Sequence, residues 1–186
     1  METFTYKEIL QQPSCWVKEY EVLLEEKARI QAFLEKYLTN ETDIVLTGAG
    51  TSAFIGDAIA PLLRGVWKNV RAVATTDIVT NAADYLAADK PLLLISFARS
   101  GNSPESVAAV NLANAICKNV AHIYITCNKN GHLAKSANAE NILSLLLPEE
   151  TDDKSLAMTS SFSTMLLTCL MISQIDHIEA ERDRIE

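Results

Sequence analysis

Residues 43–64 read DIVLTGAGTSAFIGDAIAPLLR, and this stretch indicates the fold because it has the pattern of a strand, a turn and a helix. Residues 43–47 form a short apolar run that predicts a buried strand. Gly48 and Gly50 end this run, and residues 52–64 then predict a helix. A strand that passes through a glycine turn into a helix is the repeating unit of a parallel sheet.

The same alternation continues along the chain. Further strands are predicted at residues 70–75, 91–96, 120–126 and 142–147. Helices are predicted at about residues 77–86, 104–118 and 132–137, and a long helix from about residue 161. The pattern predicts a three-layer α/β/α sandwich with a five-stranded parallel sheet. Residues 1–40 carry apolar positions at helical spacing, so we expect an N-terminal helical arm of one or two helices ahead of a domain at residues 41–186.

The composition narrows the class of protein. Of 186 residues, 16 are Lys or Arg and 24 are Asp or Glu, a net charge of −8 that argues against nucleic-acid binding. No apolar run could span a bilayer and the N-terminus lacks a signal-peptide pattern, so we expect a cytoplasmic protein without membrane contact. We expect no metal and no other cofactor, since no His/Cys/Asp cluster has metal-ligand spacing. Four cysteines are expected to be reduced core residues: Cys15, Cys117, Cys127 and Cys169.

The loop after the first predicted strand suits an anion. Gly48 and Gly50 allow close approach of the backbone, and the first amides of the following helix face outward. Thr51 and Ser52 add hydroxyl donors. The same residues also fit a tight turn in which Thr51 or Ser52 caps the helix, and the two interpretations are compatible.

The loop after the third predicted strand, residues 96–106, reads SFARSGNSPES. Ser103 followed by Pro104 is an ordinary helix start, with the serine as N-cap. Capping does not require the small polar residues 100–102 as well. Small donors with free amides at a helix N-terminus suit a phosphate group. Two such loops at one sheet edge predict a phosphorylated small molecule as the ligand.

A dinucleotide is the alternative ligand. Gly48, Gly50 and Ala53 match the loose fingerprint GxGxxG/A of dinucleotide-binding proteins. That fingerprint requires an acidic residue at the end of the second strand, about 20 residues further on. The nearest candidate, Asp77, lies 27 residues after Gly50. An oxidoreductase is therefore a weaker interpretation.

Four segments together resemble the sugar-isomerase (SIS) domain of phosphosugar enzymes. They are TGAGTSAFIGDAIAP at 47–61, LLLISFARSGNSPESVAAV at 92–110, ITCNKNG at 125–131 and LPEETDDKSLAMTSS at 147–161. The resemblance implies a flavodoxin-like fold and places the phosphate against residues of the two loops. Carried over residue by residue, these are Gly50, Thr51, Ser52, Arg99, Ser100, Gly101, Asn102 and Ser103.

The resemblance also implies a part for the start of the last helix. Thr159 and Ser160 align with the loop that caps the sugar in SIS domains, and they could equally be N-caps. Many SIS domains have a serine where Ala98 stands here, so one donor is absent and the charge of Arg99 compensates.

The implied activity is aldose–ketose isomerisation or deamination of a hexose or hexosamine 6-phosphate. One such reaction converts galactosamine 6-phosphate to tagatose 6-phosphate and ammonia, and each needs a base and a ring-opening group. No residue here is a confident catalytic base: Glu149, Glu150 and His132 read better as solvated loop residues. Relatives carry two SIS copies, so we expect a second SIS domain or a homo-oligomer, such as a dimer, to complete the site. A non-catalytic sugar-phosphate sensor remains the other alternative.

Overall fold

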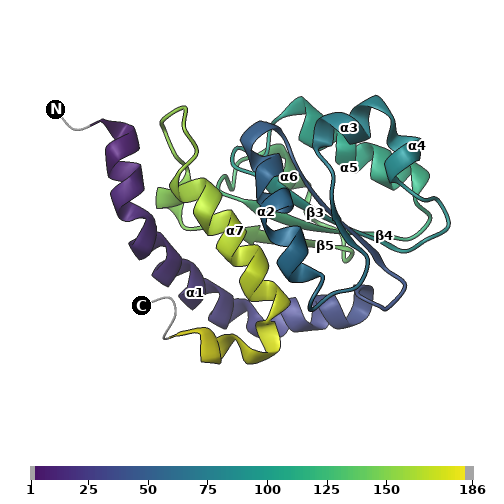
Figure 1. Cartoon of the computed structure of the whole chain (residues 1–186), viewed down its shortest axis with the longest axis horizontal. Helices are drawn as coiled ribbons and strands as arrows, with labels where there is room; N and C mark the ends of the chain where they lie inside the picture. The colour runs from purple at the N-terminus through teal and green to yellow at the C-terminus, as the bar shows by residue number, and fades with distance from the viewer. Residues whose placement is uncertain (1–2, 183–186) are drawn as a thin grey trace.

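The computed structural model describes residues 3–182 and places five strands in one sheet (Figure 1). The strands are β1 (Asp43–Gly48), β2 (Val70–Ala72), β3 (Leu92–Ala98), β4 (Val120–Thr126) and β5 (Ile142–Leu146). Their order is β2-β1-β3-β4-β5, and every neighbouring pair is parallel. The predicted α/β/α fold with a five-stranded parallel sheet is therefore confirmed.

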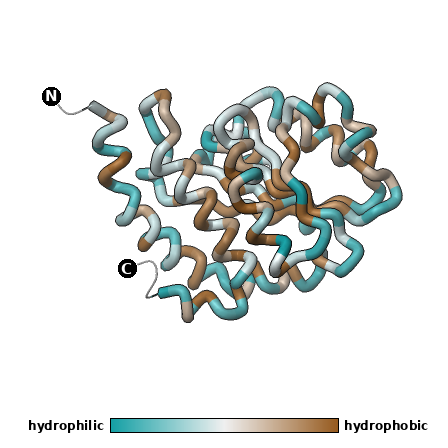
Figure 2. Tube along the Cα trace, in the orientation of Figure 1, coloured by the Kyte–Doolittle hydropathy of each residue, from teal (hydrophilic) through white to brown (hydrophobic). Residues whose placement is uncertain are grey.

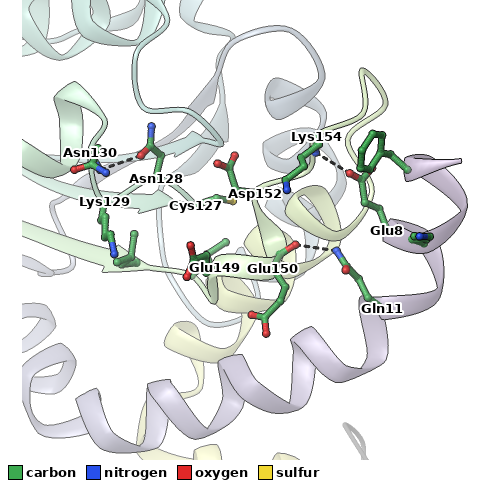
Figure 3. Close-up of a pocket in the computed structure, with 14 residues that line it drawn as sticks. Glu8, Gln11, Cys127, Asn128, Lys129, Asn130, Glu149, Glu150, Asp152 and Lys154 are labelled. Atoms are coloured by element: carbon green, nitrogen blue, oxygen red, sulfur yellow. Dashed lines mark hydrogen bonds between the residues drawn. The ribbon is translucent and has the colours of Figure 1, made fainter.

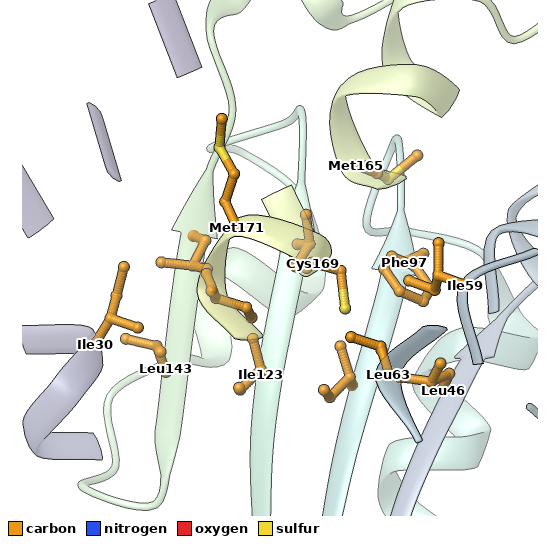
Figure 4. Close-up of a cluster of buried hydrophobic side chains, with 14 of the residues drawn as sticks. Ile30, Leu46, Ile59, Leu63, Phe97, Ile123, Leu143, Met165, Cys169 and Met171 are labelled. Atoms are coloured by element: carbon orange, nitrogen blue, oxygen red, sulfur yellow. The ribbon is translucent and has the colours of Figure 1, made fainter. Parts of the chain in front are cut away.

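Helices cover both faces of this sheet because successive strand residues point to opposite sides and both sides are apolar. One face packs against α1 (Phe4–Tyr37), α2 (Ala53–Leu63) and α7 (Ser160–Ser173). The other packs against α3 (Thr75–Thr80), α4 (Ala82–Tyr85), α5 (Pro104–Ile116) and α6 (His132–Ser136). Figure 2 shows the resulting hydrophobic centre, and Figure 4 shows Phe97 of β3 beside Met165 and Cys169 of α7.

The N-terminal residues form a single helix, α1, which lies along α7 (Figure 1). Its apolar positions Leu23 and Ile30 are fully buried in the core that α2 and α7 also line. Pro13 lies inside α1 and cannot donate to the carbonyl of Ile9. The side-chain amide of Gln12 donates to that carbonyl instead, at 3.1 Å, which keeps the acceptor paired through the proline turn.

Three predicted elements differ from the structure. The second strand ends at Ala72 rather than residue 75, because Thr75 already begins α3. The helix predicted within residues 77–86 is two short helices, interrupted at Asn81 where φ is −149°. The last helix ends at Ser173, and a 3₁₀ helix, η3 (Ile175–Glu181), follows it.

The four cysteines are free and buried, as predicted. In residues 3–182, no helix is long and apolar enough to cross a membrane. The same part of the chain holds no group of three or more His, Cys, Asp or Glu side chains placed to bind a metal ion.

Candidate functional site

The loops after β1 and β3 lie side by side at the carboxyl edge of the sheet. The two strands are hydrogen-bonded neighbours, with Thr47 opposite Ser96 and Gly48 opposite Phe97. β2 lies on one side of β1 and β3 lies on the other side. The order of the strands in the sheet therefore reverses at β1. Parallel sheets bind ligands at such a switch point. We call the loop residues 49–52 and 99–103 together the cradle.

The first cradle loop leaves its hydroxyls uncommitted to the helix. Residues Gly50–Ser52 form a short 3₁₀ turn, η1, in which Gly50 and Thr51 are exposed and Ser52 is buried. Ser52 precedes α2 but makes no side-chain capping bond. Its hydroxyl instead lies 3.8 Å from the sulfur of Met158. Ser52 therefore occupies the predicted N-cap position of α2, but its hydroxyl does not cap the helix.

The second cradle loop begins α5 as the sequence predicts. Ser103 is the N-cap and accepts a hydrogen bond from the Ser106 amide at 3.3 Å, and Pro104 occupies the first turn. The Ser103 hydroxyl also donates to the Ser106 hydroxyl at 2.6 Å. Ser100 is exposed and accepts from the amide of Asn102 at 3.3 Å. Of the two serine hydroxyls, that of Ser100 keeps its donor for a ligand.

The loop after β4, residues 127–131 (the β4 loop), holds this second loop in place, which the sequence did not predict. The Asn128 side chain donates to the Ser100 carbonyl at 3.0 Å, and the Asn102 side chain accepts from the His132 amide at 2.9 Å. Gly101 has φ of +65°, a conformation that glycine adopts without strain. A Cβ on Gly131 would lie 2.4 Å from the Ser100 carbonyl oxygen. The close approach of the two loops therefore requires glycine at 131, and the stretch CNKNG was the available signal.

Arg99 brings positive charge to the cradle. Its side chain is half-buried, and Nη1 donates to the carbonyl of Ser155 at 3.2 Å. Within the described part of the chain, no carboxylate lies within ion-pair distance of Arg99. A guanidinium carries five N–H donors, so most of them remain available to an anion.

The start of α7 is capped by a carboxylate that sequence reasoning missed. Asp153 accepts hydrogen bonds from the amides of Thr159 (2.8 Å) and Ser161 (2.9 Å) and from the hydroxyls of Ser160 and Ser161. Burial alone would raise the pKa of Asp153, but these hydrogen bonds outweigh it and lower the pKa. Ser160 is fully buried, and its hydroxyl also accepts from the side-chain amide of Gln11 at 2.8 Å. The structure thus gathers Thr159 and Ser160 around Asp153, and neither hydroxyl acts as the helix cap.

A groove of about 730 Å³ lies beside the cradle, between the N-terminal turns of α1, the β4 loop and η2 (Glu149–Thr151) (Figure 3). None of the predicted phosphate-binding residues lines it. Its lining is mostly charged or amide-bearing: Lys7, Glu8, Gln11, Asn128, Lys129, Asn130, Glu149, Glu150, Asp152 and Lys154. Cys127 is part of the wall, and burial raises the pKa of its thiol to about 12, so the thiol is not a nucleophile at neutral pH.

The loop residues weighed as a catalytic base, Glu149, Glu150 and His132, lie on the surface. Glu149 and His132 are exposed. Glu150 forms an ion pair with Lys18, and that hydrogen bond lowers the pKa of Glu150. His122 lies inside β4, bonded to Asn114 at 2.9 Å, and burial lowers its pKa to about 4. The exposed positions of Glu149, Glu150 and His132 agree with the expectation of solvated loop residues.

The SIS domain family model matches residues 37–173. A D-galactosamine-6-phosphate deaminase, AgaS, of Escherichia coli is 49% identical over 185 residues, which are 98% of this chain and 48% of that protein. The AgaS deaminase of Shewanella sp. (strain ANA-3) is 45% identical over 91% of this chain and 45% of its own length.

Solved structures agree with these sequence relatives. The crystal structure of tagatose-6-phosphate ketose/aldose isomerase from Escherichia coli superposes with a TM-score of 0.93 at 48% identity, over 98% of this chain and 51% of that one. The chain thus spans about half the length of the curated relatives it matches.

Proposed function

The chain belongs to the SIS domain family, and on that premise we propose that it is the phosphosugar-binding domain of an aldose–ketose isomerase or deaminase. The substrate class is a hexosamine or hexose 6-phosphate, which the names of the relatives suggest. Residues 41–186 form this domain, and residues 1–40 add a helical arm. We place the enzyme in the cytoplasm.

The observation that carries the proposal is the cradle at the switch point of the sheet. The α5 N-terminus presents backbone amides and the positive end of a helix dipole to a bound anion. Thr51, Ser52 and Ser100 supply hydroxyls, and Arg99 supplies a cation. Gly50, Gly101, Asn102 and Ser103 shape the two loops. This set suits a phosphate monoester better than a dinucleotide, because β2 ends at Ala72 without an acidic residue for a ribose.

The reaction would proceed by proton transfer. A base removes the proton from C2 of the open-chain aldose phosphate and a proton is delivered to C1, while the proton of the C2 hydroxyl passes to the C1 oxygen, which yields the ketose phosphate. When C2 carries an amino group, the same shift gives a ketose imine. Water then adds to the imine carbon and ammonia leaves. The residues of the cradle bind the phosphate and hold the sugar for these steps.

The base comes from outside the cradle in this proposal. Glu149 and His132 are exposed loop residues, and Glu150 is paired with Lys18. We propose that a second SIS domain or another subunit of a homo-oligomer, such as a dimer, contributes the base and the ring-opening group.

A thermal-shift titration of this chain tests the proposal. The ligands are galactosamine 6-phosphate, tagatose 6-phosphate, unphosphorylated galactosamine, inorganic phosphate and NAD. A ligand at 100 times its Kd stabilises the fold by about 2.7 kcal/mol, which is measurable. Stabilisation by the sugar phosphates and not by galactosamine is expected. Stabilisation by NAD alone would refute the proposal, and sugar-phosphate binding without ammonia release by the complete enzyme would favour a sensor.

A further inference from the structure

The loop of residues 152–158, between η2 and α7, contacts both halves of the cradle. The Ser155 carbonyl accepts a hydrogen bond from Arg99 at 3.2 Å, and Met158 meets the hydroxyl of Ser52 at 3.8 Å. Leu156 of the same loop is 98% exposed. This loop therefore contacts the Arg99 side chain through the carbonyl of Ser155.

Glu8 of α1 fixes the same loop from the other side. Its side chain is only 6% exposed, although it carries a carboxylate. One oxygen accepts from the amide of Lys154 at 2.7 Å (Figure 3) and from the amide of Ser155 at 3.1 Å. The other oxygen accepts from the Ser155 hydroxyl. Three donors from the loop satisfy this buried carboxylate. Glu8 thus binds the amide and the hydroxyl of Ser155, and Arg99 binds the carbonyl of the same residue.

We propose that Glu8 is a positioning residue, which acts through Ser155 to hold the Arg99 guanidinium where it meets the phosphate of the ligand. The inference rests on the proposed function and adds a residue from α1, outside both cradle loops, to the recognition of phosphate. An arginine side chain loses rotamer freedom when it binds, and prior fixation reduces that loss. Ser155 provides the fixation, and its own amide and hydroxyl are held by Glu8.

A purely structural role for Glu8 makes a different prediction. If Glu8 only stabilised the loop, its removal would lower the free energy of unfolding and weaken ligand binding by the same factor with or without Arg99. If Glu8 acts through Arg99, its removal matters to the phosphate only while Arg99 is present. A double-mutant cycle separates the two roles.

The test measures the Kd of galactosamine 6-phosphate by titration calorimetry for the full chain and for E8A, R99A and E8A/R99A. We expect E8A and R99A each to weaken binding by about tenfold or more, the usual loss for one charge-assisted contact. In the R99A background, E8A should change Kd by less than about twofold. Q31A is the matched control: Gln31 also ties α1 to another element, through a hydrogen bond to Asp176 of η3 at 2.7 Å, but it lies outside the groove and the cradle. Q31A should leave Kd within about twofold of the wild type.

Each outcome separates the inference from the function on which it rests. Failure of the wild-type chain to bind any sugar phosphate overturns the proposed function. Binding by the wild type with an unchanged Kd in E8A, or an equal loss in both backgrounds, overturns the inference alone. E8Q, which keeps one acceptor oxygen for the loop amides, replaces E8A if that variant does not fold, and an intermediate loss of affinity is then expected.

Discussion

Glu19 makes the stability of this fold depend on pH in an unusual direction. Its carboxyl group is 1% exposed between α1 and α7, and its one hydrogen bond comes from the Thr168 hydroxyl at 2.8 Å. The second carboxyl oxygen has no partner among the described residues. Burial raises the pKa of Glu19 from 4.5 to about 8, and the bond from Thr168 opposes the change only in part. The folded state therefore binds the proton of Glu19 more tightly than the unfolded chain does.

The size of the change in the free energy of unfolding follows from the pKa values of Glu19 in the unfolded and folded chain. Between pH 4.5 and about 8 the unfolded chain releases this proton while the folded chain retains it, so the free energy of unfolding falls as the pH rises. Each pKa unit corresponds to 1.36 kcal/mol, which gives a loss of about 5 kcal/mol once the pH exceeds 8. Such a loss is a large part of the stability of an ordinary domain.

Urea unfolding at pH 5 and pH 9 measures this effect in the wild type and in E19Q. Glutamine has nearly the shape of the protonated side chain and does not ionise, so E19Q should lose far less stability over this range. Relative to the wild type, E19Q should gain about 3–5 kcal/mol between pH 5 and pH 9. E21Q, at an exposed position of the same helix, is the control and should behave as the wild type. Equal pH dependence in the wild type and E19Q would refute the reasoning.

Three further predictions concern the loops. In urea unfolding at pH 7, D153A should lower the free energy of unfolding by about 2–4 kcal/mol because the start of α7 loses its cap. The pKa of Asp153 is lowered in the folded state, so the part of this difference that comes from ionisation should be lost as the pH falls from 3.8 through the lowered pKa. G131A should weaken galactosamine 6-phosphate binding in calorimetry, because its Cβ would displace the Ser100 carbonyl; G65A is the control, and equal affinities would contradict the packing. S100A should weaken that binding by about tenfold and S103A by less, since the Ser103 hydroxyl is engaged with Ser106; the reverse order would contradict the geometry.

The layered architecture was predictable because strands buried on both faces need uninterrupted apolar runs. Residues 92–95 read LLLI, and all four are buried, two on each face of the sheet. The start of α5 was equally legible, since Ser103 and Pro104 are local signals that depend on the next few residues alone. The end of the second strand was harder to predict. β2 is a three-residue edge strand with one neighbour, and its length depends on where the chain turns away from β1.

Sequence reasoning found the two cradle loops but not what holds them. Asn128 contacts the loop of Ser100 from 28 residues away, and Glu8 contacts Ser155 from 147 residues away. Asp153 competes with Thr159 as the cap of α7 and prevails because its carboxylate accepts several hydrogen bonds at once. No local pattern distinguishes such an aspartate from an ordinary solvated one.

The order of strands and helices along the chain, the parallel sheet and the glycine- and hydroxyl-rich loops are all readable in the amino-acid sequence. These features follow from hydrophobic periodicity and short-range backbone chemistry, which act over a few residues. Which hydroxyls stay free, where the Arg99 guanidinium is held and which carboxylates are buried become visible once the chain is folded. Those outcomes depend on hydrogen bonds and desolvation between α1, α7 and the loops. Their physical cause is proximity in space, which spacing along the chain does not record.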